Sequence, residues 1–173
     1  MEDQKMIFNF HPWTLDIDVE ATKQLYSEND YSTDPASNTK FAKQLSEKQK
    51  DFFTSIGIDP MKIKVDETIY DIPGDNKTAG RKVYRMLIDF MICGKFLAVP
   101  RFQKEIYGSD EVFGSEFPDS LKIIEDNVFP AYDIDGLGKG AVFKHPCTRF
   151  DTESFQTWDC GYIIGTILIM SDL

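Results

Sequence analysis

The sequence predicts an α+β fold in which N-terminal helices pack on a mainly antiparallel sheet. Apolar residues recur at helical spacing between residues 38 and 56. Over 82–92 every second residue from Tyr84 to Ile92 is apolar and the other face contains Arg85 and Asp89, whereas 161–170 is apolar on both faces. Helical patterns followed by strand patterns are typical of α+β proteins. With 173 residues, 42% of them hydrophobic, the chain can bury a substantial core, and we expect residues 1–173 to form a single globular domain.

The N-terminal part is expected to contain a short strand, a short helix and a loop. The pattern of residues 6–15 predicts a strand that runs into a turn at Pro12. Asp18 is placed to cap a helix that continues to about Tyr26. The segment 27–37 is rich in Ser, Asp, Asn and Pro, which favour turns, so it is predicted to be a loop.

A long helix is expected between Asn38 and Ile56. Apolar residues recur there on one helical face, and Gly57 follows as a stop signal, because glycine readily adopts the left-handed conformation at helix C-termini. The residues expected to pack on the sheet are Phe41, Leu45, Phe52 and Ile56.

The middle of the chain predicts a β-hairpin. Segments 63–72 and 82–92 are strand-like, and the turn-forming residues 73–80 join them. Gly94 then interrupts the apolar pattern, and residues 95–99 extend the same strand or open another. A bulge or bend is therefore expected near this glycine.

The last third predicts a short helix, a turn and a strand. Segment 117–128 shows helical spacing, the glycines of 136–140 indicate a turn, and 161–170, apolar on both faces, indicates a central strand. The third helix would place these residues on one face: Phe117, Leu121, Ile124 and Val128.

Three segments resemble a family of small, uncharacterised bacterial cytoplasmic proteins. The segments are WTLDIDVEATKQLY (13–26), FFTSIGIDPMK (52–62) and VYRMLIDFMICGKFL (83–97). They are similar to the family's D-x-D helix start, "slGiDPxK" turn and "Y…CGk" strand, over about residues 10–98. Many members carry clustered cysteines and an Asn before the long helix, whereas this chain has Asn38 without the cysteines. The resemblance implies one bacterial cytoplasmic domain and no particular activity. A thiolate metal site at the family's cysteine cluster is not expected in this chain, which lacks those cysteines.

Negative charge is concentrated in one segment. The chain has 19 basic and 29 acidic residues, a net charge of −10, which disfavours direct binding to nucleic acid or to anionic membranes. Residues 105–135 contain nine acids and one base, interleaved with aromatic residues that are common at protein interfaces. The alternative is a solvated acidic face whose aromatic side chains point into the core. The predicted partner-binding residues are Asp110, Glu111, Phe113, Glu116, Phe117, Asp119, Glu125 and Asp126.

These features predict a stoichiometric protein-binding module of the immunity or antitoxin-inhibitor type. Its expected partner is a basic protein such as a toxin or nuclease, because acidic side chains steer basic partners. An alternative is a small-ligand-binding protein or hydrolase-like enzyme with a pocket between helix and sheet. Its candidate side chains are His145, Cys147, Asp151 and Glu153. A housekeeping or oligomeric structural protein is the third possibility. The sequence favours a protein that is not an enzyme without deciding the point.

No cofactor or metal site is expected. The chain lacks a Cys-x-x-Cys pair, and the D-x-D-G segment at 133–136 lacks the other ligands of a calcium loop. Asp16 and Asp18 are expected to act at a helix start rather than as an acid and base pair. Three cysteines, no secretory signal and no membrane-spanning segment together predict a cytoplasmic protein.

Overall fold

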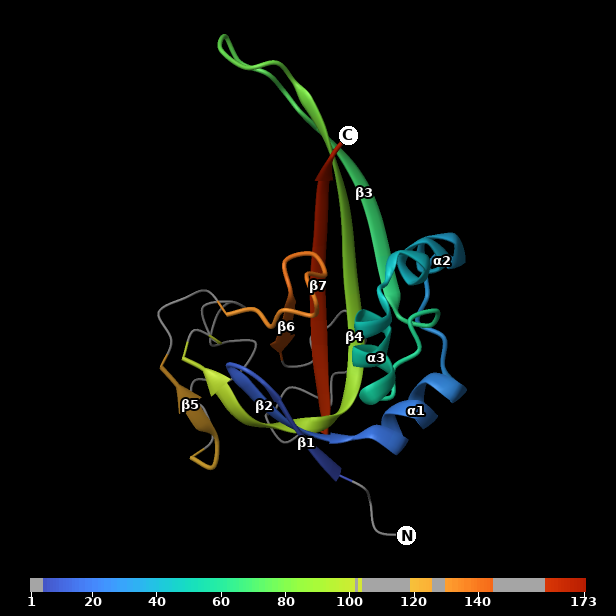
Figure 1. The fold of residues 1–173 in the computed structure, drawn as a ribbon, viewed down its shortest axis with the longest axis vertical. Coiled ribbons are helices and arrows are strands. Elements are labelled where there is room, and N and C mark those ends of the chain that lie inside the picture. Colours follow the sequence, from blue (N-terminus) through green and yellow to red (C-terminus); the bar gives the residue numbers. More distant parts are fainter. Residues whose placement is uncertain (1–4, 102, 104–118, 126–129, 145–160) are drawn as a thin grey trace.

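The computed structural model describes residues 5–101, 103, 119–125, 130–144 and 161–173 (Figure 1). Three helices and seven strands lie within these residues. In chain order they are β1 (Lys5–Phe10), β2 (Trp13–Asp18), α1 (Val19–Glu28), α2 (Pro35–Gln44), α3 (Glu47–Ser55), β3 (Lys64–Ile72), β4 (Arg81–Pro100), β5 (Lys122–Ile124), β6 (Ala141–Lys144) and β7 (Tyr162–Asp172).

The fold is α+β with a mostly antiparallel sheet, but strands and not helices come first in the chain. The expected single strand at 6–15 is instead the hairpin β1–β2, which turns at His11 and Pro12. In β2 the residues Trp13, Leu15 and Ile17 are buried while the residues between them are half-buried. This period of two is that of a strand with one face on the core, and the α1 helix begins directly after it.

The long strand β4 organises the sheet. Its first half pairs with β3 and β7, and its second half pairs with β2 and β5, giving the order β1-β2-β4-β7-β6 along the main path. β4 curves where the two halves meet (Figure 1). Gly94 lies there, and any side chain at this position would overlap the Asp16 carbonyl of β2. The expected bulge lies just beyond the glycine, where Leu97 has no partner opposite it on β2.

The predicted long helix is in fact two helices. Leu45 has an extended backbone and ends α2, and Ser46 caps α3. The Ser46 hydroxyl accepts from the Gln49 N–H at 3.2 Å, while the Gln49 side chain accepts from the Ser46 N–H at 2.8 Å. This reciprocal capping box starts a new helix. The predicted stripe is nevertheless buried, as expected, at Phe41, Leu45, Phe52 and Ile56.

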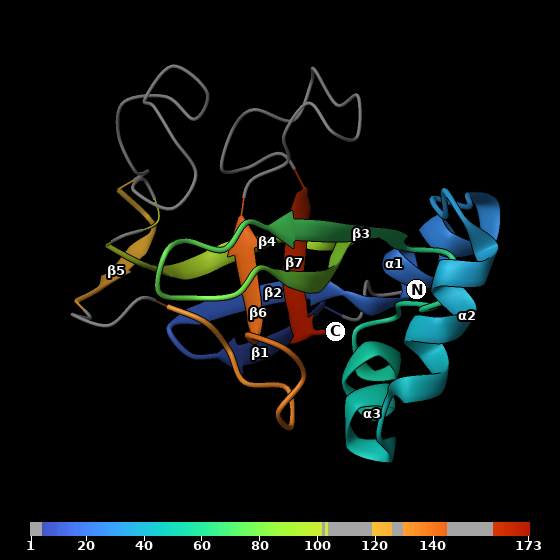
Figure 2. The ribbon, with the colours of Figure 1, turned by 90° about the horizontal axis from the view of Figure 1, so that it is seen from above.

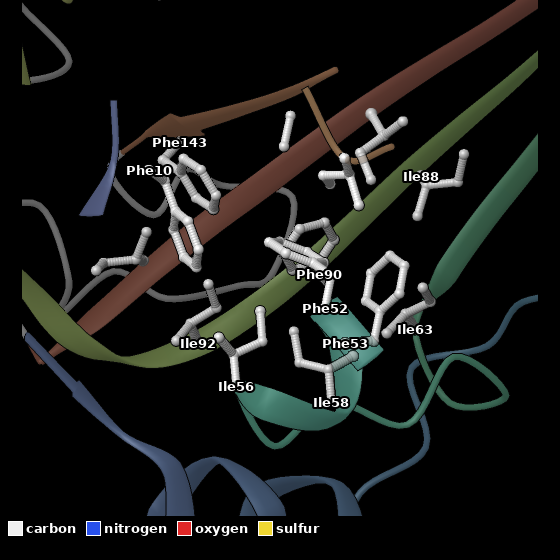
Figure 3. Packing of buried hydrophobic residues seen from close by; sticks show 14 of the residues in the cluster. Phe10, Phe52, Phe53, Ile56, Ile58, Ile63, Ile88, Phe90, Ile92 and Phe143 are labelled. Carbon is white, nitrogen blue, oxygen red and sulfur yellow. The ribbon is translucent and has the colours of Figure 1, made fainter. Parts of the chain in front are cut away.

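Aromatic rings fill the space between α3 and the sheet. The rings of Phe52 and Phe53 point at Phe90 of β4, with centroid separations of 6.4 and 5.5 Å, and Phe10 stacks on Phe143 at 5.4 Å (Figure 3). All three helices lie together on one side of the sheet (Figure 2). The apolar face of α3 is thus buried against side chains that lie far apart in the sequence.

The C-terminal third contains one wrong prediction and two confirmed ones. Residues 122–124 form β5, parallel to β4, instead of part of a helix, because pairing with residues 98–100 overrides a weak helical spacing. The predicted apolar residues Phe117 and Val128 lie outside the described residues. The glycine turn is confirmed by positive φ angles at its three glycines. The last strand is central as expected, between β4 and β6.

Candidate functional site: a projecting β-hairpin arm

The outer part of the β3–β4 hairpin projects beyond the helices, with the end of β7 beside it (Figure 1). We call residues 68–85 and 169–173 the arm. Every residue from 69 to 82 is exposed. Residues 69–82 of the arm therefore receive little support from the core, and their conformation must come from strand pairing and from the turn.

The arm is a regular hairpin with an ordered tip. β3 and β4 pair without interruption from Lys64 opposite Asp89 to Ile72 opposite Arg81. At the tip the Asp75 carboxylate accepts from the backbone N–H groups of Lys77 and Thr78, both at 2.7 Å. These bonds lower the pKa of Asp75, and the bond from Lys77 has the largest effect. Such local bonds are typical of aspartate turns and give the exposed loop a defined shape.

The exposed large apolar side chains are concentrated on the arm. Of the eight large hydrophobic residues that are exposed in the described part of the chain, five lie there. By register, three of them are on one face of the ribbon and two on the other, so neither face is covered. Exposed apolar side chains that gather on one element make that element a candidate interaction surface. The five are Ile69, Tyr70, Ile72, Met170 and Leu173.

The arm differs from the rest of the chain in charge. It contains four basic and three acidic residues, a net charge of +1, whereas the whole chain carries −10. Two ion pairs hold these charges close together: Arg81 with Asp172 at 3.2 Å, and Lys82 with Asp71 at 3.9 Å. Exposed pairs of this kind add little stability. Their consequence is an apolar surface that is close to electrically neutral on an acidic protein.

Two of the predicted partner-binding residues are described, and both are exposed. Asp119 lies in the turn before β5, and Glu125 follows β5. Arg101 binds Glu125 through two hydrogen bonds from its Nε, of 2.6 and 2.7 Å, and this lowers the pKa of Glu125. Glu125 therefore stays ionised, and the charge of Arg101 compensates part of its negative charge. The others lie outside the described residues: Asp110, Glu111, Phe113, Glu116, Phe117 and Asp126.

The segments that carry the family resemblance meet around α1. Asp18 caps the helix as predicted, accepting from the Ala21 N–H at 2.8 Å. The Tyr26 hydroxyl donates to the carbonyl of Met91 and accepts from its N–H, at 2.8 and 2.7 Å, and burial raises the pKa of Tyr26. The Lys62 ammonium donates to the Tyr26 carbonyl at 2.7 Å. These residues thus have a structural role, which is to hold α1 against the sheet.

A cavity of about 340 Å³ lies between the start of α1 and the sheet. The alternative function expects a pocket between a helix and the sheet. The lining of the cavity includes Asp16, Asp18, Cys93 and Lys95. Asp16 was expected to act at a helix start, but it lies on β2 opposite Lys95. Its Oδ1 is closed off from solvent, and the Asp18 carboxylate is engaged as the cap. The side chains expected to act in such a pocket lie outside the described residues: His145, Cys147, Asp151 and Glu153.

Cys93 is poorly suited to act as a nucleophile. Burial raises the pKa of its thiol to about 11, although a hydrogen bond from Thr22 opposes this. The thiolate is the reactive form of cysteine, and it is scarce at neutral pH when the pKa is raised. The cavity therefore offers a surface for binding but, among the described residues, no activated nucleophile.

We expect Cys93 to react slowly with iodoacetamide at neutral pH. With Cys147 and Cys160 replaced by Ser, the rate should rise with pH and reach half its maximum near pH 11, in contrast to about 8.5 for a free cysteine. The same variant unfolded in urea is the control and should react with the midpoint of a free thiol. A midpoint below 8.5 in the folded protein would contradict the expectation.

In the part of the chain that is described, no group of three or more His, Cys, Asp and Glu side chains could hold a metal ion. No described helix has the length and apolar character needed to cross a membrane. Comparison with known protein families, with curated protein sequences and with solved structures gave no match. The family resemblance therefore stays a prediction, and the described geometry is the basis for a functional proposal.

Sequence reasoning predicted the hairpin but not its projection. Ile69, Tyr70 and Ile72 were predicted only as parts of a strand. A usable signal was present, since Ile69 and Tyr70 are consecutive in a strand, so their side chains point to opposite faces and cannot both face one core. How far the helices extend along the sheet decides which of them are covered, and that is a tertiary property.

Proposed function

We propose that this protein is a stoichiometric protein-binding module and that the arm is a contact element. The observation that supports this is the location of the exposed apolar residues, five of the eight in the described chain being on one projecting hairpin. Burying such side chains against a partner contributes about 25 cal/mol per Å² of apolar area. A core residue would not gain in this way, since its area is already buried.

The acidic remainder of the chain is the second part of the proposal. Since the arm carries +1, the other residues together carry −11. In its finer form the protein is an inhibitor of the immunity or antitoxin type, whose acidic surface contacts a basic toxin or nuclease. Asp119 is exposed and supports this form. Long-range attraction would then be provided by the acidic body and short-range contact by the arm.

The test is a pull-down from the native host with variants that separate the two surfaces. The arm variant carries Ile69→Lys and Ile72→Lys. Its matched control carries Ile7→Lys, which changes an exposed side chain of β1, 71% accessible, outside the arm. A third variant carries Lys at Asp110, Glu111, Glu116 and Asp119.

We expect the wild type and the Ile7→Lys control to recover a protein in stoichiometric amount and the arm variant to lose it. A basic partner should be lost from the variant with reversed acidic charges, and its association should slow as salt rises. Recovery of the same proteins by all variants, with far-ultraviolet circular dichroism unchanged, would contradict the proposal.

A further inference from the structure

We propose that the partner of the arm is a second copy of this chain, joined through antiparallel pairing of β3 with β3. This inference rests on the proposed function, because it assigns a partner to the same contact element. Its basis is the open edge of β3, the charge balance of the arm and the order of residues along the strand.

The outer edge of β3 can accept another strand. Among the described strands β3 pairs with β4 alone. Leu173 N donates to Lys82 O at 3.0 Å, so the backbone of Lys82 faces β7 and that of its neighbour Val83 faces β3. Val83 is opposite Tyr70. Since the backbone groups of successive residues point to opposite sides of a strand, those of Ile69 and Asp71 point to the open edge.

Charge favours a second copy at this edge over a basic protein. Two copies of a chain with a net charge of −10 repel each other, but their arms carry only +1 each and have internal ion pairs. The arm is therefore a place where two copies can approach with little local repulsion. A nearly neutral arm gives a strongly basic partner no electrostatic attraction, and such a partner is attracted to the acidic body instead.

The order of residues selects one register. A twofold axis at Tyr70 places Ile69 opposite Asp71 of the second copy, and Thr68 opposite Ile72. No like charges then face each other. An axis at Ile69 would oppose Glu67 to Asp71, and an axis at Asp71 would oppose that residue to itself, and like charges directly opposite are unfavourable.

Other axes are unfavourable for steric and backbone reasons. An axis at Thr68 would extend the pairing to Val65, where α2 and the residues before it lie beside the strand. An axis at Ile72 would pair Pro73, which has no N–H to donate. The Tyr70 register, with its pairing limited to residues 68–72, avoids both obstacles and is therefore the one that the described residues support.

Cysteine cross-linking tests the register directly. With the axis at Tyr70, two copies of that residue form a non-hydrogen-bonded pair with Cα atoms about 4.5 Å apart, within the range of a disulfide. Tyr70→Cys should therefore form a covalent dimer on oxidation. Thr68→Cys alone should not, but a mixture of Thr68→Cys and Ile72→Cys proteins should. The wild type, with its native cysteines, is the control.

Sedimentation of the purified wild type tests the association itself. We expect a concentration-dependent dimer at micromolar concentrations that becomes tighter as salt rises, because salt screens the repulsion between two acidic bodies. The Ile69→Lys, Ile72→Lys variant should dimerise at least about tenfold more weakly, and Ile7→Lys should match the wild type.

A wild type that stays monomeric at all salt concentrations would overturn this inference, and so would an arm variant that dimerises as well as the wild type. A third contrary result would be that the Thr68→Cys protein, oxidised by itself, forms as much covalent dimer as the Tyr70→Cys protein. A monomeric chain that still captures a foreign protein through its arm would refute the second copy but leave the proposed function standing. A chain with neither association would refute both.

Discussion

Replacing Phe52 with alanine is expected to lower the free energy of unfolding by about 3–5 kcal/mol. The centroid of the Phe52 ring lies 5.1–6.4 Å from the ring centroids of four aromatic residues from different parts of the chain, which are Phe10, Phe53, Phe90 and Tyr132. The truncation therefore removes buried apolar area and leaves a cavity that no single neighbour can fill. A loss of this size is a large fraction of the stability of an ordinary domain.

Urea denaturation followed by circular dichroism measures this loss as a shift of the midpoint. The matched control is Ile69→Ala on the arm, which is 61% exposed and should change stability by less than about 0.5 kcal/mol. A stable Phe52→Ala protein would contradict the packing of α3. A strongly destabilised Ile69→Ala protein would show that the arm serves the fold, and this would weaken the functional proposal.

Gly165→Ala is expected to destabilise the protein by about 1–3 kcal/mol or more, through overpacking. Gly165 of β7 lies opposite Phe90 of β4, and a methyl group there would overlap Cζ and Cε2 of the Phe90 ring. This ring is fully buried and has Phe53 5.5 Å away on the side of α3. It has no room to withdraw, so the strands or the helix must move.

A double-mutant cycle identifies the cause of this effect. Phe90→Leu removes the ring, so Gly165→Ala should cost at least about 1 kcal/mol less in that background than in the wild type. Gly136→Ala serves as a contrasting glycine, because a methyl group there would meet no atom within 4 Å and only its positive φ of 77° opposes the change. Additive effects of Gly165→Ala and Phe90→Leu on the free energy of unfolding would contradict the proposed overlap.

The two kinds of exposed surface lead to different experimental signatures. The affinity between two copies that associate through the nearly neutral arm should rise with salt concentration. The affinity between the acidic body and a basic protein should fall. The sign of the salt dependence therefore identifies which surface an observed complex uses, even before its partner is known.

Local signals in the sequence were sufficient for several elements. The alternation of Met86, Ile88 and Phe90 predicts a strand, and the apolar run at 161–170 predicts a central strand. The Asp18 cap and the stripe that includes Phe41 were also predicted correctly. These features depend on neighbours within a few residues or on a simple period, so one sequence is enough to determine them.

The remaining features depend on contacts between distant residues. The break at Ser46 was missed because a capping box competes with a continuous apolar stripe, and residues 122–124 became a strand because β4 has a free edge there. The sequence by itself determined the strands of the hairpin and the acidity of the chain. Only the tertiary structure decided that the helices end short of Ile69, because the extent of packing along a sheet, and not local propensity, sets which apolar side chains stay exposed.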